Sequence, residues 1–198
     1  MTNFYENEFK FWSENICVAG ADEAGRGPLA GPVVAAAVIF TPGCIIDGVG
    51  DSKKLTPKKR DFLYEEITSL SDWAVGIVDV DIIESINILN ASRLAFARAV
   101  KGLSKKPDML LADYITGLDI DVPYKAIVKG DAAVYSIAAA SIIAKVTRDR
   151  IMEEYDAVYP EYGFKQHKGY GTKAHGLAIK QYGPCPIHRR TFLKNLLK

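Results

Sequence analysis

The sequence contains few cysteines and no long hydrophobic run. Its three cysteines (Cys17, Cys44 and Cys185) are widely spaced and odd in number, which argues against a disulfide framework or a zinc site and favours a reducing cytoplasm. No apolar stretch approaches the roughly 18 residues that a membrane-spanning helix needs, so we expect no membrane association. Residues 1–14 lack the basic start and apolar middle of a signal peptide.

An excess of charge of one sign is also missing. The formal net charge is +1, so any attraction to nucleic acid must come from local clusters of charge rather than from the whole chain. The length of 198 residues fits one domain, and the sequence shows no internal repeat and no low-complexity linker. We therefore expect residues 1–198 to form a single domain whose region from about 160 to 198 is helical. We also expect a monomer.

The hydrophobic pattern predicts an α/β domain with a mixed sheet. Strands are predicted at residues 18–21, 33–40, 73–80, 108–113 and 124–128. Helices are predicted from Pro57 to about residue 69 after a Thr56 N-cap, from 91 to about 103 after an Asn90 N-cap, from about 133 to 155, from 172 to about 182, and after Arg190.

Four carboxylates, Asp22, Glu23, Asp113 and Asp131, each follow the end of a predicted strand. Open α/β sheets bind ligands at the carboxyl ends of their strands, and clustered hard oxygen ligands select Mg²⁺ or Mn²⁺. Neighbouring residues in a regular strand point to opposite faces. Asp22 and Glu23 can therefore share a site only if the strand breaks there, or if Glu23 contributes partly through its backbone carbonyl group.

Each of these acids also has an ordinary structural explanation. An Asp-Glu pair is common in solvated turns, Asp113 could be a turn residue, and Asp131 could be a plain helix N-cap. Asp119 and Asp121 lie close enough in the sequence to compete with Asp113. Spacing alone therefore indicates a metal site only weakly.

A glycine-rich turn follows the first two acids, with the sequence Gly25-Arg26-Gly27-Pro28-Leu29-Ala30-Gly31. A dinucleotide-binding loop would require a helix directly after the glycines, whereas Pro32 and a predicted strand follow here. Two interpretations remain. The segment is either a tight turn, or a backbone that approaches a ligand closely, with Arg26 at a phosphate or a base.

Taken together, these segments resemble ribonuclease HII, the type 2 ribonuclease H of bacteria and archaea. The matching segments are residues 18–29, 51–55, 128–131, 139–149 and 167–170, and residues 188–192 are similar to the closing segment of the family. They occur in the order of the family and extend from about residue 16 to 194. Gly-Arg-Gly in place of Gly-Thr-Gly disfavours the sister family, ribonuclease HIII. In the family glycine usually follows the third acid, whereas Tyr114 follows Asp113 here.

The resemblance implies a ribonuclease H fold, in which helices flank a mixed five-stranded sheet. It implies that Asp22, Glu23, Asp113 and Asp131 are the catalytic, metal-binding acids and hold one or two Mg²⁺ or Mn²⁺ ions. It further implies that Gly25, Arg26 and Gly27 contact the ribonucleotide 2′-OH and the adjacent phosphate, and that Tyr170 packs on the sugar at the RNA-to-DNA junction.

Basic residues near these segments are further candidates for substrate contacts. They are Lys53 and Lys54 with the adjacent Ser52, and Lys145 with Ser141 one turn earlier on the same predicted helix. The histidines His167, His175 and His188 lack the spacing of metal ligands, and we assign them no catalytic role.

The expected activity is that of a metal-dependent endonuclease. It would hydrolyse the RNA strand of RNA–DNA hybrids and cut on the 5′ side of single ribonucleotides in duplex DNA, leaving 3′-OH and 5′-phosphate ends. Two alternatives remain open at this point. One is another two-metal nuclease on a related sheet, such as a junction resolvase or an exonuclease, and the other is a nucleic-acid-binding module without catalysis.

Overall fold

A five-stranded mixed sheet forms the centre of the protein, of which the computed structural model describes residues 4–194. The strand order is β3-β2-β1-β4-β5. Both β1–β2 and β2–β3 are antiparallel pairs, whereas β1–β4 and β4–β5 are parallel, which confirms the predicted fold class. The strands are β1 (Val18–Ala24), β2 (Val33–Phe40), β3 (Ser71–Val78), β4 (Met109–Asp113) and β5 (Tyr124–Ile127).

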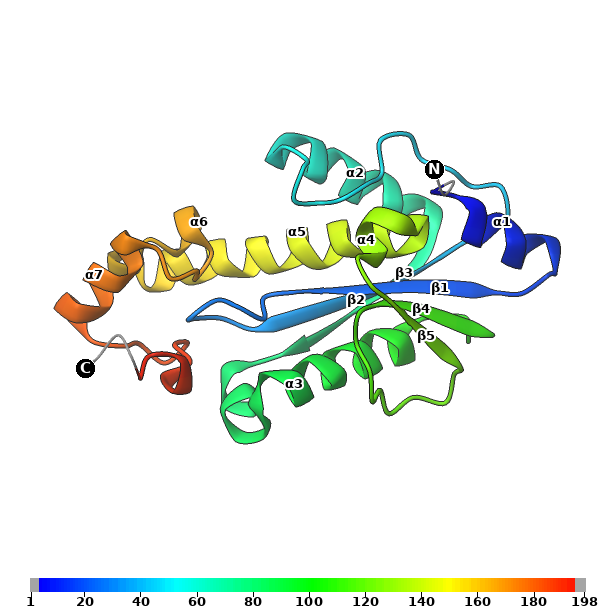
Figure 1. The fold of residues 1–198 in the computed structure, drawn as a ribbon. Coiled ribbons are helices and arrows are strands. Elements are labelled where there is room, and N and C mark those ends of the chain that lie inside the picture. Colours follow the sequence, from blue (N-terminus) through cyan, green and yellow to red (C-terminus); the bar gives the residue numbers. More distant parts are fainter. Residues whose placement is uncertain (1–3, 195–198) are drawn as a thin grey trace.

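Helices cover both faces of this sheet (Figure 1). Helices α2 and α5 pack on one face and α3 on the other, while α6 and α7 lie beyond the end of the sheet with the C-terminal segment. The helices are α1 (Glu6–Ser13), α2 (Pro57–Leu70), α3 (Val80–Gly102), α4 (Gly130–Ala133), α5 (Tyr135–Val158), α6 (Phe164–His167) and α7 (Lys173–Tyr182), with short 3₁₀ turns at Pro160–Tyr162 and Arg190–Phe192.

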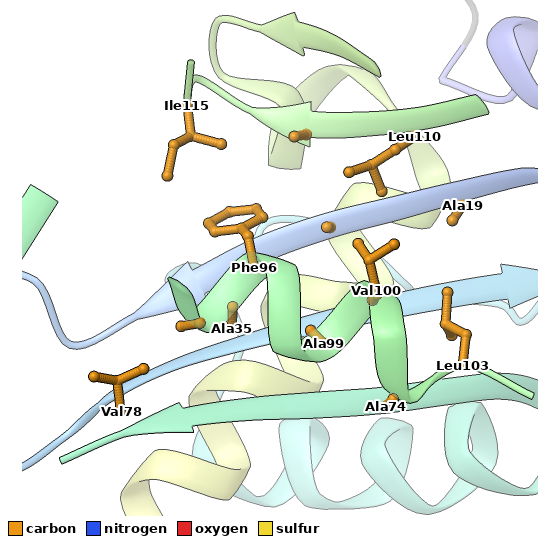
Figure 2. Packing of buried hydrophobic residues seen from close by; sticks show 14 of the residues in the cluster. Ala19, Ala35, Ala74, Val78, Phe96, Ala99, Val100, Leu103, Leu110 and Ile115 are labelled. Atoms are coloured by element: carbon orange, nitrogen blue, oxygen red, sulfur yellow. The ribbon is translucent and has the colours of Figure 1, made fainter. Parts of the chain in front are cut away.

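The central strand β2 shows why the sheet needs helices on both sides, because all eight of its residues are buried. Alternate residues of a strand face opposite sides of the sheet. Val33, Ala35, Ala37 and Ile39 accordingly pack toward α3, whereas Ala36, Val38 and Phe40 pack toward α2 and α5. Figure 2 shows the α3 side, where Phe96, Val100 and Leu103 lie over small sheet residues such as Ala19, Ala35 and Ala74.

Helix α5 packs closely on β1 at Gly20. A Cβ atom at this glycine would lie 2.2 Å from the backbone carbonyl carbon of Ser136, so no larger residue fits without moving the helix. The first turns of α5 contain small residues, Ala138 to Ser141, which favour the same close approach. This contact places the start of α5, and with it the preceding α4, beside the strand that carries Asp22.

The sequence pattern located most elements but missed some boundaries. Helix α3 begins at Val80 rather than at residue 91, and it is kinked at Asn87, which has a φ of 65°. The Oδ1 atom of Asn87 accepts hydrogen bonds from the backbone N–H groups of Leu89 and Asn90. Asn87, and not Asn90 as predicted, therefore caps the second part of this helix. The pattern also gave no indication of α1.

Two further expectations changed at the C-terminal end of the chain. The helix predicted after Arg190 is a 3₁₀ turn over Arg190–Phe192, and residues 195–198 lie outside the described part. From Pro160 to residue 194 the chain contains α6, α7 and two 3₁₀ turns joined by irregular segments, and its buried core includes Tyr162, Phe164 and Ile179 packed against Ala30 and Met152. Within residues 4–194, no helix is long and apolar enough to cross a membrane.

The buried Glu8 of helix α1 caps the N-terminal end of α5. Its Oε1 atom accepts hydrogen bonds from the backbone N–H of Ser136 at 2.8 Å and from the Ser136 hydroxyl at 2.7 Å. The first N–H groups of a helix have no partner inside the helix, and the helix dipole favours a carboxylate at this end. Glu8 therefore acts as a cap supplied from a distant part of the chain.

We predict that Glu8→Ala lowers the free energy of unfolding by about 2 kcal/mol, because it leaves buried N–H and O–H donors without an acceptor. Urea unfolding followed by circular dichroism measures this change. Glu14→Ala removes an exposed carboxylate at the other end of α1, and we expect it to change the free energy by less than about 0.5 kcal/mol. Equal effects of the two substitutions would contradict the capping role.

Candidate active site

Strand pairing brings the predicted acids together at one edge of the sheet. β1 and β4 are parallel neighbours whose pairing ends at Ala21 and Ala112, so Asp22 and Asp113 follow side by side. Asp131 lies in α4, which comes shortly after the parallel strand β5. Asp119 and Asp121 are exposed in the connection between β4 and β5, and the structure therefore places Asp113 rather than either of them in the cluster.

β1 does not break at Asp22 and Glu23, so the first of the two ways in which these residues could share a site does not apply. β1 stays paired with β2 as far as Ala24 opposite Val34. On its other side β4 no longer pairs with β1 after Ala21, so β1 is uncovered on that side at Asp22 and Glu23. Burial raises the pKa of Glu23 above its ordinary value. Arg26 and Lys53 oppose this rise and Asp113 adds to it, so Glu23 interacts electrostatically with the cluster.

The neighbouring carboxylates repel the negative charge of Asp22. Burial raises the pKa of Asp22 well above its ordinary value, and Glu23, Asp113 and Asp131 raise it further. Only 5% of the Asp22 residue surface is exposed, so water screens this repulsion poorly. The backbone N–H of Glu23 donates a hydrogen bond to Asp22 Oδ1 at 2.6 Å, which favours the charged form and offsets part of the effect.

The other three acids each have a partner. The backbone N–H of Gly130 donates to Asp113 Oδ1 at 2.6 Å. Lys53 Nζ lies 3.3 Å from Asp131 Oδ2, and Arg26 Nη1 lies 3.4 Å from Glu23 Oε1. Two cationic side chains therefore face four carboxylates, and the cluster keeps an excess of negative charge.

This donor set fits a hard divalent cation. Within residues 4–194, no three His, Cys, Asp or Glu side chains are arranged so that they could already hold a metal ion. The chemistry of the four carboxylates nevertheless suits Mg²⁺ or Mn²⁺, which prefer oxygen ligands. A divalent cation would also offset the repulsion that raises the pKa of Asp22.

Two buried arginines hold the glycine-rich turn, and sequence reasoning assigned them no role. Arg189 donates hydrogen bonds to the carbonyl oxygens of Gly25 at 2.6 Å, Arg26 at 3.0 Å and Gly31 at 2.7 Å. Arg148 donates to the carbonyl oxygens of Ala30, Pro32 and Lys168 at 2.9–3.0 Å. Both residues are at most 1% exposed. A buried charge requires such a complete set of hydrogen bonds, but the sequence cannot show where its partners lie.

Tyr170 lies next to this turn. The backbone N–H of Leu29 donates to the Gly169 carbonyl oxygen at 2.8 Å, and the Arg148 guanidinium lies 5.9 Å from the centre of the Tyr170 ring. Tyr170 is 45% exposed, so the residue lies at the surface beside the turn. Arg148 thus connects the turn at residues 25–32 with the segment that carries Tyr170.

The remaining candidate residues occupy different positions. Lys53 and Lys54 are exposed, and Lys54 pairs with Asp51 at 3.6 Å. Ser52 and Ser141 are buried, and the Ser141 hydroxyl donates a hydrogen bond to the Ala138 carbonyl oxygen. Lys145 pairs with Asp149 at 2.7 Å in a separate polar groove between α2, α5 and α6.

A comparison with known protein families decides the assignment of this site. The model of the family described as Ribonuclease HII matches residues 19–195. The chain belongs to the ribonuclease HII family. Membership makes it a hydrolytic ribonuclease of the ribonuclease H class. The resemblance noted in the sequence is thereby confirmed.

Individual relatives cover nearly the whole chain. The ribonuclease HII of Clostridioides difficile is 55% identical over 98% of this chain and 76% of that protein. The ribonuclease HII of Caldicellulosiruptor saccharolyticus is 52% identical over 99% of this chain and 97% of that protein. The crystal structure of ribonuclease H2 from Pyrococcus horikoshii superposes with a TM-score of 0.76 at 32% identity, covering 90% of this chain and 96% of that chain.

Two glycines in the ribonuclease HII turn allow a matched test of its packing. Gly25 has a φ of +100°, and a Cβ atom there would lie 2.2 Å from Arg148 Nε and 2.7 Å from the Pro32 carbonyl oxygen. A Cβ atom at Gly27 would meet nothing within 4 Å. We predict that Gly25→Ala lowers the free energy of unfolding by about 2 kcal/mol or more, whereas Gly27→Ala changes it by less than about 0.5 kcal/mol. Chemical denaturation of both variants measures the difference, and similar stabilities would contradict the described packing.

Proposed function

We propose that this ribonuclease HII is an endonuclease with two substrates. It hydrolyses the RNA strand of RNA–DNA hybrids, and it cuts on the 5′ side of single ribonucleotides in duplex DNA, leaving 3′-OH and 5′-phosphate ends. The observation that carries the proposal is the position of the acid cluster directly before the turn of residues 25–31. The acids lie on β1, on the neighbouring strand β4 and on α4, and the turn leaves β1 within a few residues of Asp22.

The proposed cofactor is Mg²⁺ or Mn²⁺, held by Asp22, Glu23, Asp113 and Asp131. When bound, such a cation supplies positive charge that stabilises the phosphate oxygens in the transition state and lowers the pKa of an attacking water. The excess negative charge and the raised pKa of Asp22 support this role, because both effects are relieved by a divalent cation. Lys53 adds one positive charge beside Asp131.

The turn at residues 25–31 is suited to testing for a 2′-OH group. This hydroxyl is the only group that distinguishes one ribonucleotide from its DNA neighbours, and it both donates and accepts hydrogen bonds. Arg189 holds the carbonyl groups of Gly25 and Arg26 from the inside. The space in front of Gly27 is open, so the edge of a sugar could approach the backbone there without meeting a side chain.

Exposed side chains around the turn provide further contacts in the proposal. Arg26 can bind a phosphate through its guanidinium group, and Lys53 and Lys54 can bind others as point charges. Tyr170 offers an aromatic face for the sugar at the RNA-to-DNA junction. We further propose that residues 1–198 act as one domain and as a monomer.

The first test uses a DNA duplex that contains one ribonucleotide. We predict one cut on the 5′ side of the ribonucleotide with Mg²⁺ or Mn²⁺, and no cut when EDTA removes the cation. Asp22→Asn should lower the rate by about 10²-fold or more, because the site loses a charged ligand. Denaturing gel electrophoresis of end-labelled strands measures both the rate and the position of the cut.

An all-DNA duplex and a branched DNA junction are the controls for this assay. Cleavage of either at a comparable rate would favour a different two-metal nuclease, because such enzymes need no 2′-OH. An intact strand under every metal condition, with binding retained, would favour a non-catalytic nucleic-acid-binding protein. Both results would contradict the proposal.

The second test concerns recognition of the hydroxyl group. Gly27→Ala places a methyl group in the open space in front of the turn while the protein should keep its stability. We predict that its kcat/KM on the single-ribonucleotide duplex falls about tenfold or more, because a site that hydrogen-bonds a hydroxyl depends on close contact. Asp121→Ala, at an exposed position away from the turn, serves as the control. An unchanged kcat/KM for Gly27→Ala would exclude close approach at this glycine.

A further inference from the structure

Two buried histidines outside the acid cluster form a direct hydrogen bond. His175 in α7 and His188, shortly before the last 3₁₀ turn, are 0% and 2% exposed, and their Nε2 atoms lie 3.0 Å apart. Two nitrogen atoms at this distance form a hydrogen bond only if one carries a proton and the other has a free lone pair. The neighbouring groups determine which of the two Nε2 atoms carries the proton.

The backbone of Cys185 sets the proton position of His188. Its N–H group donates to His188 Nδ1 at 3.0 Å, so Nδ1 is an acceptor and the proton of the neutral ring lies on Nε2. The Cys185 Sγ atom also lies 3.0 Å from the same Nδ1 atom, and its thiol can donate there as well. His188 Nε2–H therefore donates to His175 Nε2.

The proton of His175 must then lie on Nδ1, which is 3.0 Å from the carbonyl oxygen of Tyr170. The three hydrogen bonds run in one direction, from Cys185 N–H through His188 and His175 to Tyr170. We call these four residues the histidine relay. Only one arrangement of protons satisfies every contact when both rings are neutral.

A second proton on either ring would lack a good acceptor. On His188 it would face the Cys185 N–H group, with the Cys185 sulfur as a weak acceptor at 3.0 Å, and on His175 it would face His188 Nε2–H. The titratable groups that face the pair are His167, whose ring stacks on His175 at 4.3 Å between centroids, and Tyr162 and Cys185 beside His188. Burial lowers the pKa of both rings to about 4, in agreement with the geometry.

The histidine relay ends at Tyr170, whose backbone forms hydrogen bonds with several partners. The Tyr170 N–H donates to the His167 carbonyl oxygen, and the Tyr170 carbonyl oxygen also accepts from the Thr172 N–H at 2.8 Å. The ring of Tyr170 itself stays on the surface beside Arg148. Of these hydrogen bonds, the one from His175 comes from a side chain. His175 in turn contacts His188, which lies beside the glycine-rich turn.

The other end of the histidine relay is tied to that turn. Ala30 and His188 form an antiparallel bridge. The Gly31 N–H donates to the Ile187 carbonyl oxygen at 2.9 Å, and the Arg189 N–H donates to the Leu29 carbonyl oxygen at 2.8 Å. The histidine relay thus connects the turn at residues 25–31, which would contact the 2′-OH, with Tyr170, which would contact the next sugar.

We propose that His175 and His188 are positioning residues, which hold the Tyr170 backbone at a fixed place relative to the turn of residues 25–31. This role rests on the proposed function, in which the turn and the tyrosine contact neighbouring sugars of one strand. Correct spacing of the two contacts would let Tyr170 favour cleavage where a ribonucleotide is followed by DNA.

The proton positions can be measured without a substrate. Long-range ¹H–¹⁵N spectra of the histidine rings should show the Nδ1–H tautomer for His175 and the Nε2–H tautomer for His188 at pH 7. Both rings should stay neutral at pH 5.5. An Nε2–H tautomer for His175, or protonation of either ring near the ordinary pKa of 6.5, would overturn the histidine relay.

The pH dependence has a definite sign. The unfolded chain takes up protons at these two histidines below about pH 6.5, whereas the folded rings stay neutral down to about pH 4. Their contribution to stability is therefore complete above about pH 6.5 and is lost as the pH falls toward 4. Wild type should lose its stability advantage over His175→Asn in this window, and a constant difference would contradict the assignment.

Two amide substitutions at His175 separate positioning from packing. Asn can place an N–H group near the position of Nδ1 and keep the hydrogen bond to Tyr170. Gln can reach only the position of Nε2 and loses that bond. We predict that His175→Gln lowers kcat/KM on the single-ribonucleotide duplex about tenfold, whereas His175→Asn stays within about threefold of wild type.

A double-mutant cycle with Tyr170→Ala provides the control. If the histidine acts through Tyr170, His175→Gln should cause no further loss in the Tyr170→Ala background. Equal losses in both backgrounds would overturn the positioning role and indicate general damage to the fold. The predicted tautomers together with no cleavage by the wild-type protein would instead overturn the proposed function, so the two failures are distinguishable.

Discussion

The close packing of α5 on β1 at Gly20 is the constraint on which the rest of the structure depends. It brings the N-terminal end of the longest helix against the strand that carries Asp22, and it fixes where α4 and Asp131 lie. The same helix carries Arg148, three turns further on, to the glycine-rich turn. One contact between a glycine and a helix backbone therefore positions both the acids and the turn.

This arrangement holds like charges together against their repulsion. Backbone pairing of β1 with β2 and β4 fixes Asp22 and Asp113, and strand pairing does not depend on the charge of the side chains. The burial that raises the pKa of Asp22 is a local cost in stability, and the cores on either side of the sheet must offset it. Functional sites commonly carry such a cost.

The sequence predicted those parts of the site that depend on local pattern. Short apolar runs that end in a carboxylate indicated Asp22 and Asp113, and parallel pairing then placed them together. Of the two ways considered for Asp22 and Glu23 to share a site, a strand break does not occur, because only one of the two neighbouring strands stops there. Asn87 and Asn90 are both good caps, and the choice between them depended on a backbone angle that the sequence does not show.

Long-range partners could not be predicted in this way. Arg189 binds carbonyl groups more than 150 residues earlier in the chain. The sequence cannot show which carbonyl groups these are, because every residue has a backbone carbonyl group. His175 and His188 were set aside because they lack metal-ligand spacing, which is a correct observation about metals only. Glu8 lies in a segment where the sequence pattern indicated no helix, and the sequence does not show that its partner is Ser136.

The two buried arginines have a consequence for the electric field of the protein. In an ion pair a carboxylate would cancel the charge of each guanidinium, but within residues 4–194 neither arginine has an acidic side chain at ion-pair distance. Carbonyl dipoles satisfy their hydrogen bonds and leave two net positive charges beneath the glycine-rich turn. The molecule thus places a positive potential beside a negative one on the same edge of the sheet, and an elongated polyanion could be oriented by this gradient before any contact forms.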